Sequence, residues 1–144
     1  METIKPKVIS LFAVSILIIF IATVISNNKN PLEIEDLQGK WKGKYKNYNI
    51  SLIIYKDNIC TLVSYQASQG KANEYSGECS IEIIKAPSSL KMLNIDELGT
   101  PLYSIFEIKS NSVIRMSSFS TKWRLRPVIM NKTNSFILNK DTYK

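Results

Sequence analysis

The segment Glu74–Ile84 alternates strictly between two kinds of side chain. A β-strand projects successive side chains to opposite faces of its sheet, so this period of two predicts a strand with one buried and one solvated face. A lone strand is not stable, and its apolar face therefore requires further strands around a shared core. The apolar face would carry Tyr75, Gly77, Cys79, Ile81 and Ile83, and the polar face Glu74, Ser76, Glu78, Ser80 and Glu82.

The same kind of segment recurs along the chain, with turn residues such as Asn, Asp, Gly, Pro and Ser between the repeats. No amphipathic helical pattern of ten or more residues interrupts the series. Nine short strands without helices are typical of an all-β domain, either a small antiparallel up-and-down β-barrel or a sandwich. The other eight predicted strands are Lys40–Lys46, Asn49–Tyr55, Ile59–Gln66, Leu90–Ile95, Leu102–Lys109, Val113–Phe119, Lys122–Met130 and Ser135–Leu138.

An apolar run, Val8–Ser26, precedes this domain and contains no charged residue, Pro or Gly. A helix of this length, at ~1.5 Å per residue, reaches roughly 28 Å, close to the thickness of a bilayer core. Lys5 and Lys7 lie before the run, and the positive-inside rule places them in the cytoplasm. We therefore expect a single-pass signal anchor in the cytoplasmic (inner) membrane, with the C-terminal domain periplasmic or extracellular. The alternative is a signal peptide cleaved after Val24-Ile25-Ser26, which would make the protein secreted.

The expected organisation follows from these segments. Residues 1–7 form a cytoplasmic N-terminus, residues 8–26 the transmembrane helix, and residues 27–36 a linker that contains Pro31. Residues 37–144 form the β-domain, and about 110 residues are the usual size of one domain. One hydrophobic core is therefore expected.

Composition narrows the classes of function. The chain contains no His, which excludes Ser–His and Cys–His nucleophile systems and His-containing metal sites. Its two cysteines cannot build a Cys-rich zinc site. We therefore expect a non-catalytic protein without a metal or other cofactor. The net charge of +7 favours an anionic lipid, envelope or acidic protein surface as partner, whereas the spread of basic residues along the chain disfavours nucleic acid.

The cysteines suggest one disulfide. If Ile59–Gln66 and Glu74–Ile84 form a hairpin centred between Gln69 and Gly70, Cys60 lies directly opposite Cys79. Facing positions on antiparallel strands can meet disulfide distances, so we predict a Cys60–Cys79 bridge in an oxidising compartment. The alternative is two reduced cysteines packed as small hydrophobic residues. The same register would pair Leu62 with Gly77, Ser64 with Tyr75, and Thr61 with Glu78.

The first predicted strand has two contrasting faces. Trp41, Gly43 and Tyr45 fall on one side. The other side is a basic face available to an acidic partner, and it consists of Lys40, Lys42, Lys44 and Lys46.

Gly39-Lys40-Trp41 at the start of the first strand, with an Arg on a late strand, resembles the lipocalin family and the wider calycin superfamily. The resemblance implies a barrel in which Trp41, after Gly39, closes one end. It also implies that Arg124 or Arg126 packs across the Trp41 ring as a cation–π plug.

In such a barrel, a ligand would enter through the end opposite the plug. We expect it to contact Tyr45, Leu62, Tyr75, Tyr103, Phe106, Arg115 and Phe119. The alternative is an interior filled by side chains, as in other small barrels.

Two functions are compatible with these expectations. The first is a membrane-anchored extracytoplasmic barrel that binds a small apolar ligand or an envelope component. The second is a solid-core interaction module, such as an inhibitor, an immunity-type protein or an accessory subunit of a membrane complex. In that case the basic face would bind the partner.

Overall fold

The computed structural model describes residues 33–83, 86–125 and 127–142. The predicted cytoplasmic N-terminus, the predicted membrane segment Val8–Ser26 and most of the predicted linker lie outside these ranges, as does Arg126. Within the described ranges, no helix is long and apolar enough to cross a membrane.

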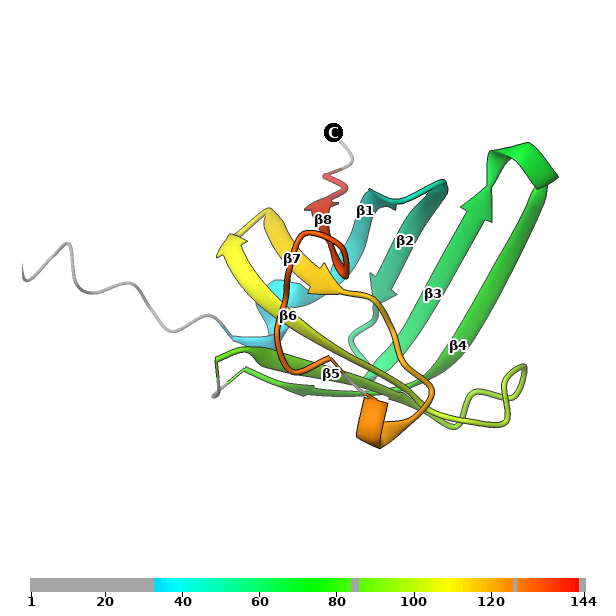
Figure 1. The fold of residues 1–144 in the computed structure, drawn as a ribbon. Helices are drawn as coiled ribbons and strands as arrows, with labels where there is room; N and C mark the ends of the chain where they lie inside the picture. The colour runs from blue at the N-terminus through cyan, green and yellow to red at the C-terminus, as the bar shows by residue number, and fades with distance from the viewer. Residues whose placement is uncertain (1–32, 84–85, 126, 143–144) are drawn as a thin grey trace, which may run out of the picture. The chain divides into compact units, whose positions relative to one another are not determined.

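The described part forms a closed antiparallel barrel of eight strands (Figure 1). Each strand pairs with the next along the chain, and β8 pairs with β1 to close the ring. The all-β prediction is confirmed, and the architecture is a barrel. The strands are β1 (Gly39–Tyr45), β2 (Tyr48–Ile54), β3 (Ile59–Gln66), β4 (Lys71–Glu82), β5 (Ser88–Leu93), β6 (Leu102–Ser110), β7 (Val113–Ser117) and β8 (Ser135–Lys140), with 3-10 turns η1 (Ile34–Leu37), η2 (Ala67–Gln69) and η3 (Trp123–Leu125).

The prediction of a ninth strand at Lys122–Met130 is wrong. Its described residues contain only η3, and they lie in the β7–β8 connection, residues 118–134. A closed barrel has no free strand edge, so an additional strand has no backbone groups with which to pair. The connection instead folds back over the outer face of β5 and β6, where Trp123 and Val128 border a groove with Tyr103.

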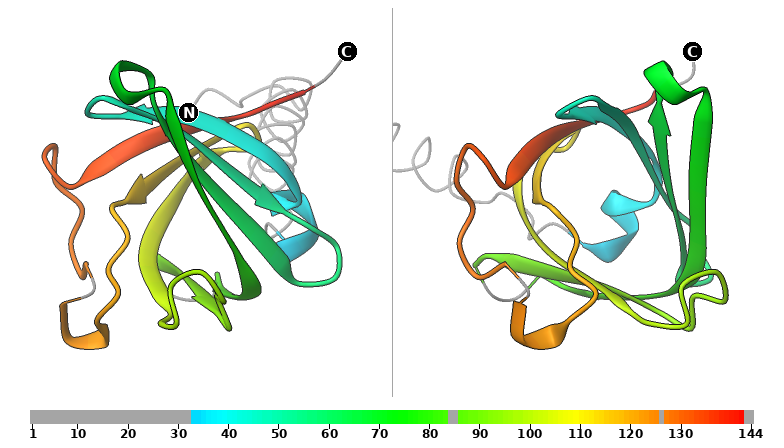
Figure 2. Two further views of the ribbon diagram at one scale, coloured as in Figure 1. Left: turned by 90° about the vertical axis from the view of Figure 1, so that its right-hand side faces the viewer. Right: turned by 45° about the vertical axis from the view of Figure 1, so that its right-hand side comes forward.

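The core fills the end of the barrel that η1 covers. Figure 2 shows η1 projecting across the ring of strands at this end. Leu37 of η1 and Trp41 of β1 are almost completely buried, together with Leu52, Ile114 and Leu138 from the surrounding strands. A cavity bordered by Leu37, Leu52 and Ile114, among others, has a volume of only ≈ 10 Å³, about enough for one water molecule. This end of the barrel is therefore solid.

The disulfide between Cys60 and Cys79 is present, with their Cα atoms 5.6 Å apart. The predicted register was wrong by two residues, because Cys60 pairs with Gly77 and Cys79 lies two residues further along β4. The cause is the hairpin loop: η2 ends at Gly70, whose φ of 61° is left-handed, so β4 begins at Lys71 opposite Gln66. A shift of two keeps every side chain on its predicted face. The observed pairs are Leu62 with Tyr75, Ser64 with Asn73, and Thr61 with Ser76.

Removal of this disulfide is expected to lower the free energy of unfolding by about 3 kcal/mol, because it closes a loop of some twenty residues in the unfolded chain. Urea unfolding of a Cys60→Ala/Cys79→Ala variant, compared with the oxidised protein, measures the difference. Reductant should shift the unfolding midpoint of the parent chain and leave that of the variant unchanged. A parent midpoint that does not respond to complete reduction would contradict the prediction.

Candidate functional site

The end of the barrel that η1 covers, called the closed end below, is organised around Trp41. Its indole Nε1 donates a hydrogen bond to the Leu37 carbonyl oxygen at 2.7 Å, which ties η1 to β1. The Lys140 ammonium lies 5.4 Å from the centre of the Trp41 ring and donates to the Asp36 carbonyl oxygen at 2.7 Å. Gly39 permits this arrangement, because a Cβ at its position would lie 3.3 Å from Lys140 Cε. The cation on the Trp41 ring is therefore a lysine from the last strand.

The expected partner Arg124 lies instead in the exposed turn η3, and Arg126 is outside the described residues. The alternation along β8 indicates that Lys140 points inward. Phe136, Leu138 and Lys140 follow one another by steps of two on the inward face. The resemblance to lipocalins implies an Arg as the cation over Trp41, and Lys140 was therefore not predicted.

The seven predicted ligand-contacting residues do not all lie inside the barrel. Tyr45, Leu62, Tyr75 and Phe106 lie on the inward side of their strands. Leu62 and Phe106 are buried in the core, whereas Tyr45 and Tyr75 are half-buried. Phe119 is half-buried beyond the end of β7. The inward-facing set therefore belongs largely to the core.

Tyr45 is held in place by the neighbouring strand β8 and the segment that precedes it. Its ring packs against Phe136 with centroids 5.1 Å apart, and its hydroxyl donates to the Thr133 carbonyl oxygen at 3.1 Å. This contact joins β1 to the end of the β7–β8 connection.

Arg115 and Tyr103 point outward, contrary to the prediction that they line the interior. Arg115 Nε donates to the Ser135 hydroxyl at 3.0 Å, and its guanidinium lies 4.0 Å from the Glu107 carboxylate. The Lys109 ammonium, bonded to that carboxylate at 2.6 Å, lowers the pKa of Glu107. Arg115 is thus part of a surface charge cluster.

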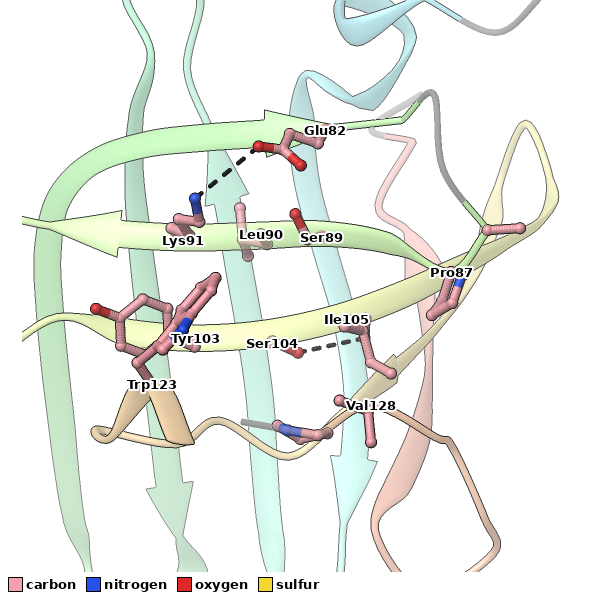
Figure 3. A pocket seen from close by; sticks show the side chains of 12 residues that line it. Glu82, Pro87, Ser89, Leu90, Lys91, Tyr103, Ser104, Ile105, Trp123 and Val128 are labelled. Atoms are coloured by element: carbon pink, nitrogen blue, oxygen red, sulfur yellow. Dashed lines mark hydrogen bonds and ion pairs between the residues drawn. The ribbon is translucent and has the colours of Figure 1, made fainter. Parts of the chain in front are cut away.

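Tyr103 lines an outer groove of about 510 Å³ (Figure 3). The outward side chains of β5 and β6 form its floor, and the β7–β8 connection forms its roof. Figure 3 shows Tyr103 and Trp123 together at one end and Pro87 at the other. The bordering residues are Glu82, Ala86, Pro87, Ser89, Leu90, Lys91, Tyr103, Ser104, Ile105, Trp123, Pro127 and Val128.

The aromatic end of the groove has a defined geometry. The rings of Tyr103 and Trp123 meet edge to face, with centroids 5.3 Å apart and planes at 71°. The Lys91 ammonium lies 5.3 Å from the centre of the Trp123 ring and 3.9 Å from the Glu82 carboxylate. Lys91 and Glu82 are the charged groups among the bordering residues, so the groove combines apolar walls with one charged rim.

The roof is anchored to β6 by backbone and hydroxyl hydrogen bonds. The Tyr103 N–H donates to the Ser120 carbonyl oxygen at 2.8 Å, and the Ser120 N–H donates back at 2.9 Å. The buried Ser117 hydroxyl accepts from the Ile105 N–H at 3.1 Å and lies 3.0 Å from the Ser104 hydroxyl. These bonds hold the connection against the barrel at the point where it leaves β7.

The far end of the connection is shaped by two asparagines. Asn131 Oδ1 accepts from the Thr133 and Asn134 N–H groups, each at 2.9 Å, and Asn134 Nδ2 donates to the Ile129 carbonyl oxygen at 3.0 Å. The Ser135 hydroxyl also donates to the Asn131 carbonyl oxygen. The roof therefore has a defined local structure at both ends, in addition to the short 3-10 turn η3.

The predicted basic face lies on the outer side of β1. Lys40, Lys42 and Lys44 border a second hollow of about 510 Å³ together with outward residues of β2 and β3. Lys42 pairs with Asp141 at 2.6 Å, and Lys46 lies beyond the strand with its ammonium 5.2 Å from the Tyr45 ring. The row therefore consists of three lysines, one of which is paired with a carboxylate.

Among the described residues, no three His, Cys, Asp or Glu side chains gather closely enough to hold a metal ion. Comparison of the chain with protein-family models, curated proteins and solved structures gives no significant match. The barrel and its surfaces are therefore the features from which a function can be inferred.

Proposed function

We propose that this chain is a membrane-anchored, extracytoplasmic binding protein whose lipocalin-like barrel carries a small, largely apolar molecule. The ligand site is the outer groove between β5, β6 and the β7–β8 connection. The single observation that carries the proposal is the groove itself, about 510 Å³ in volume and bordered by Tyr103 and Trp123.

The size and chemistry of the groove suit such a ligand. Binding sites for small molecules usually occupy roughly 300–1,000 Å³ and combine apolar walls with a few polar groups. Here Ile105, Pro127 and Val128 supply apolar surface, and the two aromatic rings offer flat faces and edges. Lys91 and Glu82 can orient one polar group of the ligand at the rim.

The closed end supports the lipocalin-like description. Trp41 lies on the first strand directly after Gly39-Lys40, is buried to 1 % exposure, and carries a cation from the last strand over its ring. Because side chains pack closely around Trp41, we place the proposed ligand site on the outer surface and not on the barrel axis. The disulfide agrees with the oxidising compartment that this function requires.

The test is binding of the uncharged fluorescent probe N-phenyl-1-naphthylamine to the compact unit Glu33–Lys144. Cooperative thermal unfolding of this fragment is established first. The parent should bind the probe, and Trp123→Ala should weaken binding at least about tenfold, because an aromatic wall worth roughly 1.4 kcal/mol is lost.

Tyr65→Ala is the matched control, since Tyr65 is an exposed aromatic residue on the outer side of β3, away from the groove. Its probe affinity should equal that of the parent. If Trp123→Ala binds normally while Tyr75→Ala does not, the ligand lies inside the barrel and the groove proposal fails.

A further inference from the structure

The β7–β8 connection exposes an unusual group of apolar side chains. Trp123, Leu125, Val128 and Ile129 are 50, 69, 66 and 73 % exposed, respectively. We call these four residues the apolar tip. Single exposed apolar residues are common on proteins, but a cluster within seven consecutive positions marks an interaction surface.

The sequence on either side of the tip is also uneven in charge, although Lys109 and Arg115 contact Glu107 and Lys140 contacts Trp41 elsewhere on the barrel. Basic residues occur throughout the chain, but the stretch Ile108–Lys140 contains seven of them and no Asp or Glu. Since the chain as a whole carries +7, this stretch accounts for the entire excess and the remainder is balanced. Lys122 and Arg124 alternate with the tip residues and are exposed, and Lys132 follows as another exposed cation.

We propose that the apolar tip inserts into the surface of an anionic bilayer. Leu125 and Ile129 would enter the boundary between headgroups and acyl chains, and Trp123 suits the interface because its ring is apolar and its N–H is polar. Lys122, Arg124 and Lys132 would contact the lipid phosphates, with their aliphatic stems along the apolar layer.

Charge complementarity favours a bilayer over a protein partner. Apolar and cationic side chains alternate along one loop, which matches a layer that presents anionic headgroups above hydrocarbon. The sequence also predicts a linker of ten residues after the membrane segment, and such a linker spans at most about 35 Å. The domain would therefore work next to the bilayer.

The apolar tip shares Trp123 and Val128 with the border of the ligand groove. Leu125 and Ile129 are the most exposed members of the tip and do not border the groove. Changes at these two positions therefore test the bilayer contact while leaving the proposed ligand walls in place.

The experiment uses the full chain reconstituted in phosphatidylcholine vesicles, with or without phosphatidylglycerol, that contain lipids brominated on the acyl chains. The chain has two tryptophans, and Trp41 is only 1 % exposed, so quenching by bromine reports mainly on Trp123. A Trp123→Phe variant supplies the Trp41 background. We expect quenching that increases with phosphatidylglycerol.

Two variants give the decisive comparison. Leu125→Ser/Ile129→Ser should abolish the quenching. In vesicles that contain phosphatidylglycerol, Lys122→Ser/Arg124→Ser should lower the ratio of inserted to free tips by roughly fivefold for each cation removed. Tyr55→Ser/Tyr65→Ser removes two exposed apolar side chains elsewhere and should behave as the parent.

Equal quenching in the parent and in Leu125→Ser/Ile129→Ser would overturn the proposal. It would also fail if Trp123 were shielded from aqueous iodide without being quenched by bromolipid. In that case, shielding that increases with the number of protein molecules per vesicle would show that a second copy of the chain covers the apolar tip.

Discussion

Trp41→Ala is expected to lower the free energy of unfolding by about 3–5 kcal/mol, the usual cost of truncating a large buried aromatic residue. Trp41 is 1 % exposed, so the substitution opens a cavity in the core. It also leaves the buried Leu37 carbonyl oxygen without the indole N–H and removes the ring beneath Lys140.

Urea unfolding of the Glu33–Lys144 unit, followed by far-UV circular dichroism, measures this change. Trp41→Phe keeps most of the volume and should be less destabilising than Trp41→Ala. Trp123→Ala is the matched control, because Trp123 is 50 % exposed and its loss should have a much smaller effect. Equal midpoints for Trp41→Ala and Trp123→Ala would show that Trp41 does not organise the closed end.

Gly43→Ala is expected to cost about 3 kcal/mol or more, or to prevent folding, because the new methyl group has no space. A Cβ at this position would lie 2.0 Å from the Ile137 carbonyl oxygen and 2.8 Å from Leu138 Cδ2. Gly43 pairs with Leu138 across the β1–β8 seam, so the clash separates the two strands that close the barrel.

The same unfolding experiment tests this prediction. Gly70→Ala is the control: its φ of 61° is unfavourable for alanine, but nothing lies within 4 Å of the added Cβ. That variant should lose only the ~1–2 kcal/mol of left-handed backbone strain. A Gly43→Ala protein as stable as Gly70→Ala would mean that the β1–β8 seam can open without cost.

Much of the barrel was predictable from local patterns. Eight of the nine predicted strands exist, and the inward and outward faces of β1 and β4 follow the alternation of Trp41 with lysines and of Cys79 with glutamates. The disulfide partners were also correct. The hairpin register was not, because it depended on the conformation of η2 and Gly70 rather than on the alternation.

The candidate site was less accessible to prediction. The sequence predicts Tyr103 as a ligand contact inside the barrel, whereas its side chain lies on the outer face. Its neighbour Trp123 lay in a segment whose alternation is typical of a strand. Only the closure of the ring shows that this segment has no partner strand and must pack elsewhere.

The sequence by itself determined the all-β class, most strand boundaries, the buried role of Trp41 and the pairing of the cysteines. These features depend on period-two alternation and turn residues, which act over a few neighbouring positions. The tertiary structure decided the rest: Lys140 over Trp41, the solid closed end, the groove between β5, β6 and the β7–β8 connection, and the apolar tip. Each of these requires segments far apart in the chain to meet, and that depends on how the barrel closes.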